Sequence, residues 1–591
     1  MSLDIARNIA FSGLWATQAQ ISVASSNISN ADTTGYTRKT ANQASSVTAG
    51  VGTGVTVTGI TSSVDKLLLK SLIGSNSDLG SADTTNNYLT QLSQLYGSTG
   101  SSDSSSTGTS LANTLAALES ALSSLAGTPG SASLQSNAVS ALDAVATQLR
   151  DTSSSIQKLR SNADQDIASS VADVNTDVKQ IADLNAQIRQ LSATGQSTAD
   201  LEDQRNTALQ DLSSKMNVSY STSSNGDLLV YTNSGQALVD STAHTLSYTT
   251  AANVTASTSY GSGASSGFSA ITLNGVDITS QITSGKIGAL VTLRDQTLPA
   301  AQSQLDQLAK QLATSLNAVS NQGTAVPPPT SLTGTTSVTS TTALSATGTV
   351  RLAVSDQSGN LVSYSDLDLS SYATVGDLVT AINGISGLSA SIDSSGHLKI
   401  ASTTTGDGVA INQMTSSVGS NGAGFSAYFG LNDLVTATGA GNFAVRSDIL
   451  AGTAALPTAT LDSSATLEAG NAVLSSGSAT VVNALYTKLT GSTSFASAGG
   501  LAATTGSFAD YAAAIVSNVA SKASQASSTY TTKETAQSTY ASSLSSESGV
   551  NLDEESARLS SLQNKYSAAS ELIQMINTMF SSLLTAVKSA G

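Results

Sequence analysis

The chain contains 591 residues with a net charge of −16, and only 24 of its residues are Lys or Arg. A surface that binds nucleic acid or an anionic membrane needs clustered basic residues, so neither is a suitable partner. The sequence contains no cysteine, which excludes disulfide bonds and thiol catalysis. Apolar residues make up 39% of the chain, the composition of a globular protein that can bury a core.

The first residues, MSLDIARNIAFSGLWATQAQ, have no basic segment followed by a sustained apolar run. They therefore lack the form of a secretory signal peptide. No apolar run approaches the ~20 residues that cross a membrane as a helix. We expect a protein that either stays in the cell or leaves it by a route without a cleaved signal.

The first predicted element is a helix that ends near Asn30. Mostly apolar residues recur along it in steps of three and four, which is a moderate heptad pattern. This seam consists of Leu3, Arg7, Ala10, Leu14, Thr17, Ile21, Ala24 and Ile28. The stretch SSNISNADTTGYTRK at 25–39 then brings in Asn, Asp and Gly, which favour a helix end followed by a turn.

The next part of the chain predicts a helical bundle. SSDSSSTGTS at 101–110 is expected to be a flexible loop. A long helix is predicted over 134–192, with an apolar seam that runs from Ile167 to Leu191. A second helix, over 199–215, follows a short turn that contains glycine. Long helices joined in this way form an antiparallel, rod-like bundle.

The middle of the chain predicts β-strands. GDLLVYTNSGQALVD, AITLNGVDIT and SASIDSSGHLKIAS each have the pattern of a hairpin. In the second of them, Asn274 and Gly275 are the residues that a type I′ turn needs. The segment 326–348 combines three prolines with Ser and Thr, and we expect it to be a linker. Residues 349–494 then form a β-rich outer domain.

The chain is expected to end in two helices, over 508–545 and from about residue 552 onward. Asn551 with Glu554 can form a capping-box-like start, and the acidic residues 553–555 suit the positive end of a helix dipole. The last helix has an unbroken apolar seam at Leu559, Leu562, Tyr566, Ala569, Ile573, Ile576, Phe580, Leu583 and Val587. Such a seam is either buried within one globular domain or forms a coiled coil with the N-terminal helix or other subunits.

These elements predict an α+β fold in which the chain runs outward and returns. Residues 1–40 and 552–591 form a terminal helical coiled-coil domain. Residues 41–325 and 495–551 form a helical bundle with β-hairpins, and the linker leads from it to the inserted outer domain.

Few residues are candidates for chemistry. The two histidines, His244 and His397, lie in strand-like text without a second metal ligand nearby, so we expect ordinary surface or edge-strand positions. Residues 263–267 match the pattern G-x-S-x-G, but the sequence predicts no strand–turn–helix junction there, and Ser and Gly are frequent. No carboxylate pair, metal site or cofactor site can be nominated, so function is expected to depend on packing and assembly.

The two ends of the chain resemble a known family. ASSNISNADTTGYTRK at 24–39 resembles the N-terminal signature of bacterial flagellar rod, hook and hook-associated proteins, through Ala24, Asn27, Ile28, Asn30, Gly35 and Tyr36. ESGVNLDEESARLSSLQNKYSAASELIQMINTMFSSLL is similar to the C-terminal motif of the same group. SGVNLDEE, with the segment that starts DLEDQRN at Asp200, resembles the FlgK family of hook–filament junction proteins. Residues 374–403 look like a small inserted motif of flagellins and hook-associated proteins.

This resemblance implies a non-enzymatic structural subunit that assembles through its terminal helices. The implied partners are further copies of the chain, the hook protein, the second junction protein FlgL, the export chaperone FlgN at the C-terminal helix, and the flagellar type III export apparatus. The implied location is the extracellular hook–filament junction, reached without a cleaved signal. The expected assembly interface consists of Leu14, Ile21, Asn27, Ile28, Asn30, Gly35, Tyr36, Leu559, Leu562, Tyr566, Ile573, Ile576, Phe580, Leu583 and Val587.

Other functions stay open. The chain could be another axial component, such as a hook protein or a filament-type subunit. An adhesin would normally carry a signal peptide or an anchoring domain. A cell-wall hydrolase would need an acid pair or a metal site in 349–494, and the sequence offers neither.

Overall fold

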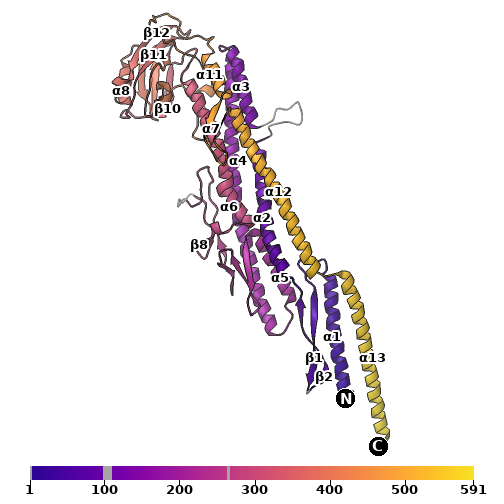
Figure 1. Ribbon diagram of the computed structural model, residues 1–591. Helices are drawn as coiled ribbons and strands as arrows, with labels where there is room; N and C mark the ends of the chain where they lie inside the picture. The colour runs from indigo at the N-terminus through magenta and orange to yellow at the C-terminus, as the bar shows by residue number, and fades with distance from the viewer. Residues whose placement is uncertain (1–2, 49, 98–109, 262–266, 591) are drawn as a thin grey trace.

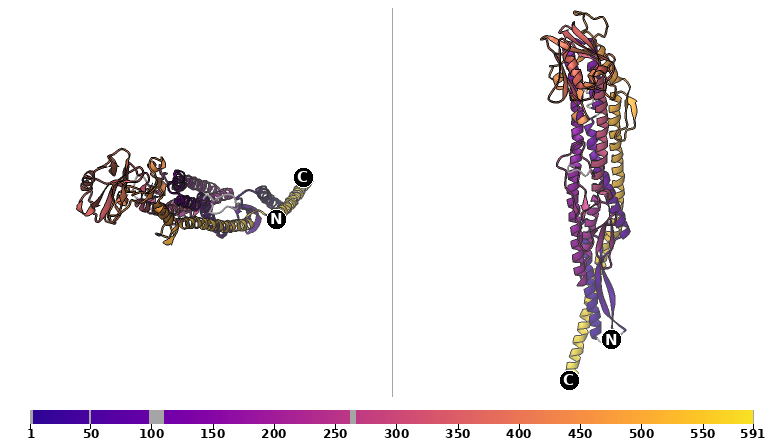
Figure 2. Two further views of the ribbon diagram at one scale, coloured as in Figure 1. Left: turned by 90° about the horizontal axis from the view of Figure 1, so that it is seen from above. Right: turned by 90° about the vertical axis from the view of Figure 1, so that its left-hand side faces the viewer.

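The computed structural model describes residues 3–48, 50–97, 110–261 and 267–590. The molecule is a long rod of helices with a β-rich domain at one end and the two chain termini at the other (Figures 1 and 2). This arrangement confirms the predicted α+β fold, with long helices at both ends of the sequence. The predicted loop at 101–110 lies, except for Ser110, outside the described residues.

The long helices predicted from apolar periodicity are present. They are α1 (Leu3–Ser29), α4 (Ala132–Ala193), α5 (Ala199–Lys215), α12 (Phe508–Ser548) and α13 (Leu552–Ala590). The seam of α4 from Ile167 to Ile188 is buried, and Leu191 lies half-buried at its end. The α13 N-terminus is capped by Asn551, whose side chain accepts hydrogen bonds from the backbone amides of Asp553 and Glu554.

Four further helices were not predicted: α2 (Lys66–Leu95), α3 (Leu111–Gly127), α6 (Gly285–Thr292) and α7 (Leu298–Ser320), the last two joined by a π-helical turn at Leu293–Thr297. The sequence of α2 is rich in Ser, Thr, Asn and Gly, which lowers intrinsic helix propensity. Its buried residues Leu69, Ile73, Leu89 and Leu92 pack into the bundle core, so tertiary packing overrides that propensity.

The three predicted hairpins form. β4 (Leu228–Thr232) pairs with β5 (Ala237–Val239), β7 (Thr272–Leu273) with β8 (Val276–Asp277), and β13 (Leu388–Ile392) with β14 (His397–Ser402). Asn274 and Gly275 both have positive φ, 52° and 81°, as a type I′ turn requires. A fourth hairpin, β1 (Lys39–Thr48) with β2 (Val51–Ser62), was not predicted and lies beside α1 (Figure 1).

The segment predicted as a linker, 326–348, is part of the outer domain. Its residues 331–337 form strand β10 (Ser331–Ser337), which pairs with β14. Leu332 and Leu344 are buried in the same apolar cluster as Phe425 and Phe429. The Ser and Thr residues that favoured a linker lie on the exposed face of a strand whose alternate residues are buried.

The outer domain contains two three-stranded antiparallel sheets, β10-β14-β13 and β12-β11-β15. The second consists of β11 (Thr349–Asp356), β12 (Leu361–Asp368) and β15 (Asp407–Asn412), and helix α8 (Val375–Asn383) packs on the domain core. The predicted end of this domain at residue 494 differs from the structure. Helix α11 (Thr480–Thr490) buries Val481, Leu485 and Leu489 in the core of the helical bundle.

The remaining elements are short. They are β3 (Val218–Thr222), β6 (Leu246–Ser247), β9 (Thr324–Ala325), β16 (Val435–Thr436), β17 (Ala444–Val445), β18 (Pro457–Ala459), β19 (Thr493–Phe495), β20 (Thr504–Gly506), α9 (Phe425–Phe429) and α10 (Ser447–Leu450). None of the described helices is long and apolar enough to cross a membrane.

Candidate assembly interface

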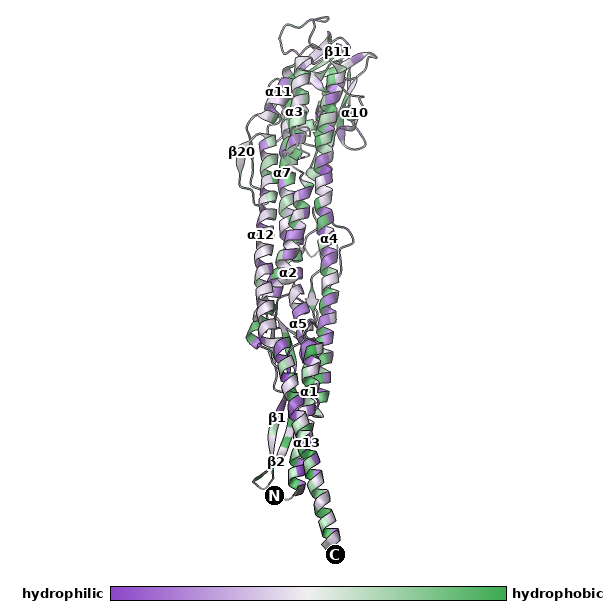
Figure 3. Cartoon of the chain, turned by 90° about the vertical axis from the view of Figure 1, so that its right-hand side faces the viewer, coloured by the Kyte–Doolittle hydropathy of each residue, from purple (hydrophilic) through white to green (hydrophobic). Residues whose placement is uncertain are grey.

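Helices α1 and α13 lie side by side at the lower end of the rod (Figures 1 and 3). Their contact includes a small apolar cluster in which Ala10, Ile573 and Ile576 are buried and Ala6 and Leu14 are partly buried. This cluster is separate from the large core of the bundle. The terminal helices therefore pair within one chain, but few large side chains hold them together.

The predicted α13 seam divides into two parts. Leu562, Ile573 and Ile576 are buried, and Leu559 and Tyr566 are half-buried. Phe580, Leu583 and Val587, in the last turns, are exposed. On α1, Leu14, Ile21 and Ile28 are half-buried. Both interpretations of the seam thus apply, because its first part packs inside the chain and its last part has no partner in the described residues.

A second apolar surface on the same helices was missed. On α1, Phe11 and Trp15 are exposed, with Trp15 76% accessible. On α13, Leu572, Met575 and Met579 are exposed beside the seam. Their spacing of three and four residues was visible in the sequence as a second apolar row. Exposed apolar side chains gathered on neighbouring helices mark interaction surfaces, and we call this set, with Phe580, Leu583 and Val587, the terminal apolar surface.

The turn after α1 is organised by Asn27, which is fully buried. Its Oδ1 accepts hydrogen bonds from Tyr36 Oη at 2.9 Å and from the Lys39 backbone amide at 3.1 Å, and its Nδ2 donates to the Lys39 carbonyl at 3.0 Å. One amide side chain thus closes the loop between the helix end and the first strand. We call residues 27–39 the corner segment.

Two other predicted residues shape the corner segment locally. Asn30 donates from Nδ2 to the carbonyl of Ser26 at 2.9 Å and accepts from Thr33 Oγ1 at 3.3 Å, so it ends the helix. Gly35 has φ of +79°, and a Cβ at this position would collide with the hydroxyl of Thr207 on α5. Glycine is needed here both for the backbone conformation and for the close approach.

The corner segment is also fastened to α5. Thr37 donates to Asp203 from its backbone amide, at 3.0 Å, and from its hydroxyl, at 2.5 Å. The ammonium of Lys39 forms ion pairs with Asp200 and, at 3.4 Å, with Asp203, and lies 3.8 Å from the centre of the Tyr36 ring. Both Lys39 and Asp203 are buried.

The electrostatic cost of this contact falls on Asp203. Burial raises the pKa of Asp203 above its ordinary value, and the hydrogen bonds from Thr37 and the charge of Lys39 offset only part of that rise. Burial by itself would lower the pKa of Lys39, but its hydrogen bond to Asp200 and the charge of Asp203 outweigh burial, so that pKa is raised. The lysine is therefore a firmly charged anchor.

A third connection joins the corner segment to the C-terminal helices. The Arg38 guanidinium contacts Glu555 Oε1 at 2.7 Å and Glu554 Oε2 at 3.6 Å, and the Arg38 amide donates to the carbonyl of Ser548 at 2.8 Å. The Glu555 side chain is fully buried at the start of α13. The amide of Asp65 donates to Ser548 Oγ at 3.1 Å. The corner segment thus links α1, α5, and the junction between α12 and α13.

The candidates for chemistry have ordinary surroundings. His244 contacts Asp240 at 2.9 Å and His397 lies 3.7 Å from Asp393, each four residues along the chain. No group of three or more His, Asp or Glu side chains in the described ranges is placed to hold a metal ion. Most of the G-x-S-x-G match at 263–267 lies outside the described residues.

Known protein families match four parts of the chain. Residues 8–37 match "Flagella basal body rod protein" and residues 541–586 match "Flagellar basal body rod FlgEFG protein C-terminal". Residues 331–404 match "Flagellin hook IN motif". Residues 100–330 match "Flagellar hook-associated protein FlgK helical domain". The chain belongs to the FlgK family of flagellar hook-associated proteins. The resemblance drawn from the sequence motifs is confirmed.

Similar individual proteins carry related names. Flagellar hook-associated protein 1 of Salmonella typhimurium is 28% identical over 326 residues, which cover 54% of this chain and 56% of that protein. The Escherichia coli protein of the same name is 28% identical over 321 residues, 52% of this chain and 56% of its own length. The chain thus spans about half the length of the curated relatives it matches. A solved FlgK structure from Burkholderia pseudomallei aligns with a TM-score of 0.46 at 17% identity, covering 80% of this chain and 98% of the other.

Proposed function

We propose that this FlgK-family chain is a non-enzymatic structural subunit of the junction between hook and filament. The observation that carries the proposal is the lower end of the rod, where both termini meet as long helices and expose the terminal apolar surface. A helix with an exposed apolar face stabilises itself by packing against other helices. Further copies of the chain supply such helices in a tube, and the hook protein and the second junction protein FlgL are the proposed neighbours along it.

The predicted interface residues have two proposed roles. Phe580, Leu583 and Val587 contact neighbouring subunits, because they are exposed. Asn27, Asn30, Gly35 and Tyr36 hold the corner segment in shape, because their side chains or backbone are engaged within the chain.

The terminal helices are proposed to become fully ordered on assembly. Their pairing depends on one small apolar cluster, and an isolated helix of this length is marginal in water. Ordering on association would keep the subunit soluble before it is exported through the type III apparatus without a cleaved signal. The chaperone FlgN is the proposed binder of α13 before export, since the exposed apolar residues of α13 require cover.

Electron microscopy of cells that lack the gene tests the junction role. We expect hooks without filaments and filament protein shed into the medium, because filament subunits have no base to polymerise on. Normal filaments would overturn the proposal. Loss of the hook as well would favour the alternative, a hook or other axial component, which the rod-type matches at both ends also allow.

Circular dichroism of the monomer with and without residues 1–40 and 555–591 tests the ordering on assembly. If the truncated form loses helical signal in proportion to the residues removed, the terminal helices are already folded in the monomer and this part of the proposal fails.

A further inference from the structure

Helix α12 is attached to the bundle very unevenly. Its large buried side chains, Phe508, Tyr511, Ile515 and Val519, all lie in its first twelve residues. There the Tyr511 ring stacks on Phe495 with 4.1 Å between centroids. This upper part belongs to the main apolar core of the bundle.

The following residues, 520–547, which we call the strap, have a different contact. Ala526 is the one buried residue among them, with an accessibility of 8%. Two polar contacts reach α2: Lys533 Nζ to Asp78 Oδ2 at 2.7 Å and Gln537 Nε2 to Asn76 Oδ1 at 3.1 Å. Both side chains of the ion pair are more than a third exposed, and such pairs contribute little stability.

The hydroxyl groups of the strap do not add contacts to α2. Those of Ser528, Thr529, Thr531, Thr532, Thr535 and Thr539 donate to backbone carbonyls four residues earlier in α12 itself. Their hydrogen bonds are therefore kept whether or not the strap lies on α2. Separation of the two helices leaves these groups satisfied, and water can replace the two polar contacts.

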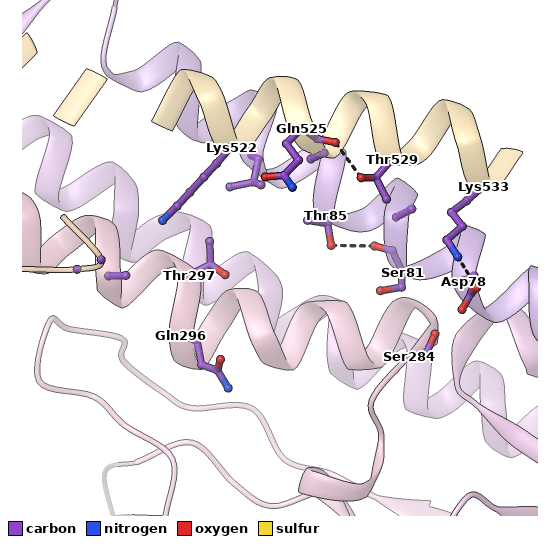
Figure 4. Close-up of a pocket in the computed structure, with 16 residues that line it drawn as sticks. Asp78, Ser81, Thr85, Ser284, Gln296, Thr297, Lys522, Gln525, Thr529 and Lys533 are labelled. Carbon is purple, nitrogen blue, oxygen red and sulfur yellow. Dashed lines mark hydrogen bonds and ion pairs between the residues drawn. The ribbon is translucent and has the colours of Figure 1, made fainter. Parts of the chain in front are cut away.

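Space between the strap and its neighbours supports the same inference. A cavity of about 630 Å³ lies between α12, α2 and the α6–α7 turn, lined by Ser81, Thr85, Lys522, Gln525 and Thr529 among others (Figure 4). Another, of about 650 Å³, is lined by Tyr530 and Gln537 on the strap together with residues of α2, α4, α5 and α6. Spaces of this size hold many waters, so little apolar contact is lost when the strap moves away.

We infer that the strap opens from α2 as one unit while the upper part of α12 and the rest of the bundle stay folded. The upper part of α12 is the pivot, because its aromatic and aliphatic side chains are held in the core. The lower end of the strap, Ser548, is joined to the corner segment through Arg38. Opening therefore allows the corner segment and the terminal helix pair to tilt against the rod. This inference does not depend on the proposed place of the protein in the flagellum.

Hydrogen–deuterium exchange on the full chain tests the inference. We expect the amides of 524–543 to exchange together, and at least about tenfold faster than those of 512–519 and of the buried centre of α4, because local opening needs less free energy than global unfolding. Equal rates in the two parts of α12 would overturn the inference. Faster exchange that decreases gradually from Ser548 upward would also overturn it, since that pattern is end fraying.

Two variants ask whether contact with α2 controls the exchange. Because the chain has no cysteine, Ala82→Cys with Ala526→Cys can form a single disulfide across the cavity, and its oxidation should slow the strap to the rate of residues 512–519. Thr529→Leu, which fills the same cavity, should slow the strap at least threefold, whereas Thr532→Leu, at an exposed position of the same helix, should not. A strap rate unchanged by both the oxidised disulfide and Thr529→Leu would overturn the inference.

Discussion

Replacement of Asn27 by alanine should loosen the corner segment specifically. The variant removes a side chain that makes three hydrogen bonds and leaves the buried amide and carbonyl of Lys39 without their partner. A buried backbone group without a partner costs about 1–3 kcal/mol, so the two groups together cost about 2–6 kcal/mol. The Tyr36 hydroxyl adds little to this total, because it is half-buried and water can replace the lost bond.

The effect should appear in the amides that are bonded across the corner segment. These are the amides of Thr37, which donates to Asp203, of Arg38, which donates to Ser548, and of Ser63, which donates to Arg38. A cost of 2 kcal/mol or more corresponds to exchange at least about thirtyfold faster at these positions. The midpoint of thermal unfolding should change much less, because the large core lies in the bundle.

Asn30→Ala is the matched control. Asn30 bonds within the turn and is half-exposed, so water can replace its partners and exchange at the three amides should stay near the wild-type rate. If Asn27→Ala leaves these amides as protected as they are in the unmodified chain, the role given to Asn27 is wrong.

Further predictions concern the corner segment, the terminal apolar surface and a surface ion pair. Gly35→Ala should destabilise the docking of the corner segment on α5 by about 1–2 kcal/mol from the positive φ alone, measured by the same exchange assay; unchanged protection would contradict the close approach. Ile576→Asp should release α13 from α1 in the monomer, since burial of such a side chain contributes about 1.5–3 kcal/mol. Phe580→Asp should leave the monomer intact and prevent polymerisation; monomer circular dichroism and incorporation into filaments separate the two, and equal behaviour would refute the division of the seam. Asp240, whose pKa is lowered to about 2 by the hydrogen bond to His244, should titrate near its ordinary value in His244→Gln by NMR; its stabilising effect is present above pH 4 and is lost as the pH falls toward 2.

The sequence by itself determined the helices with a clear apolar period and the hairpins with a clear turn. The α4 seam, the α13 seam and Asn274-Gly275 each encode their structure within one short segment, so local reading finds them. The terminal motifs were likewise enough for the family. Helix α2 and strand β10 could not be found in this way, because their Ser- and Thr-rich sequences take their structure from side chains buried against distant segments.

Only the tertiary structure decided what the corner residues do. Asn27 and Gly35 stand out in the sequence, but their partners are Lys39 and Thr207, and the second of these lies far along the chain on α5. It also showed that the seam of α13 is buried as far as Ile576 and exposed beyond it. An apolar period reports which side of a helix is suited to contact, whereas the length and position of the facing helix decide how much of that side is covered in one chain.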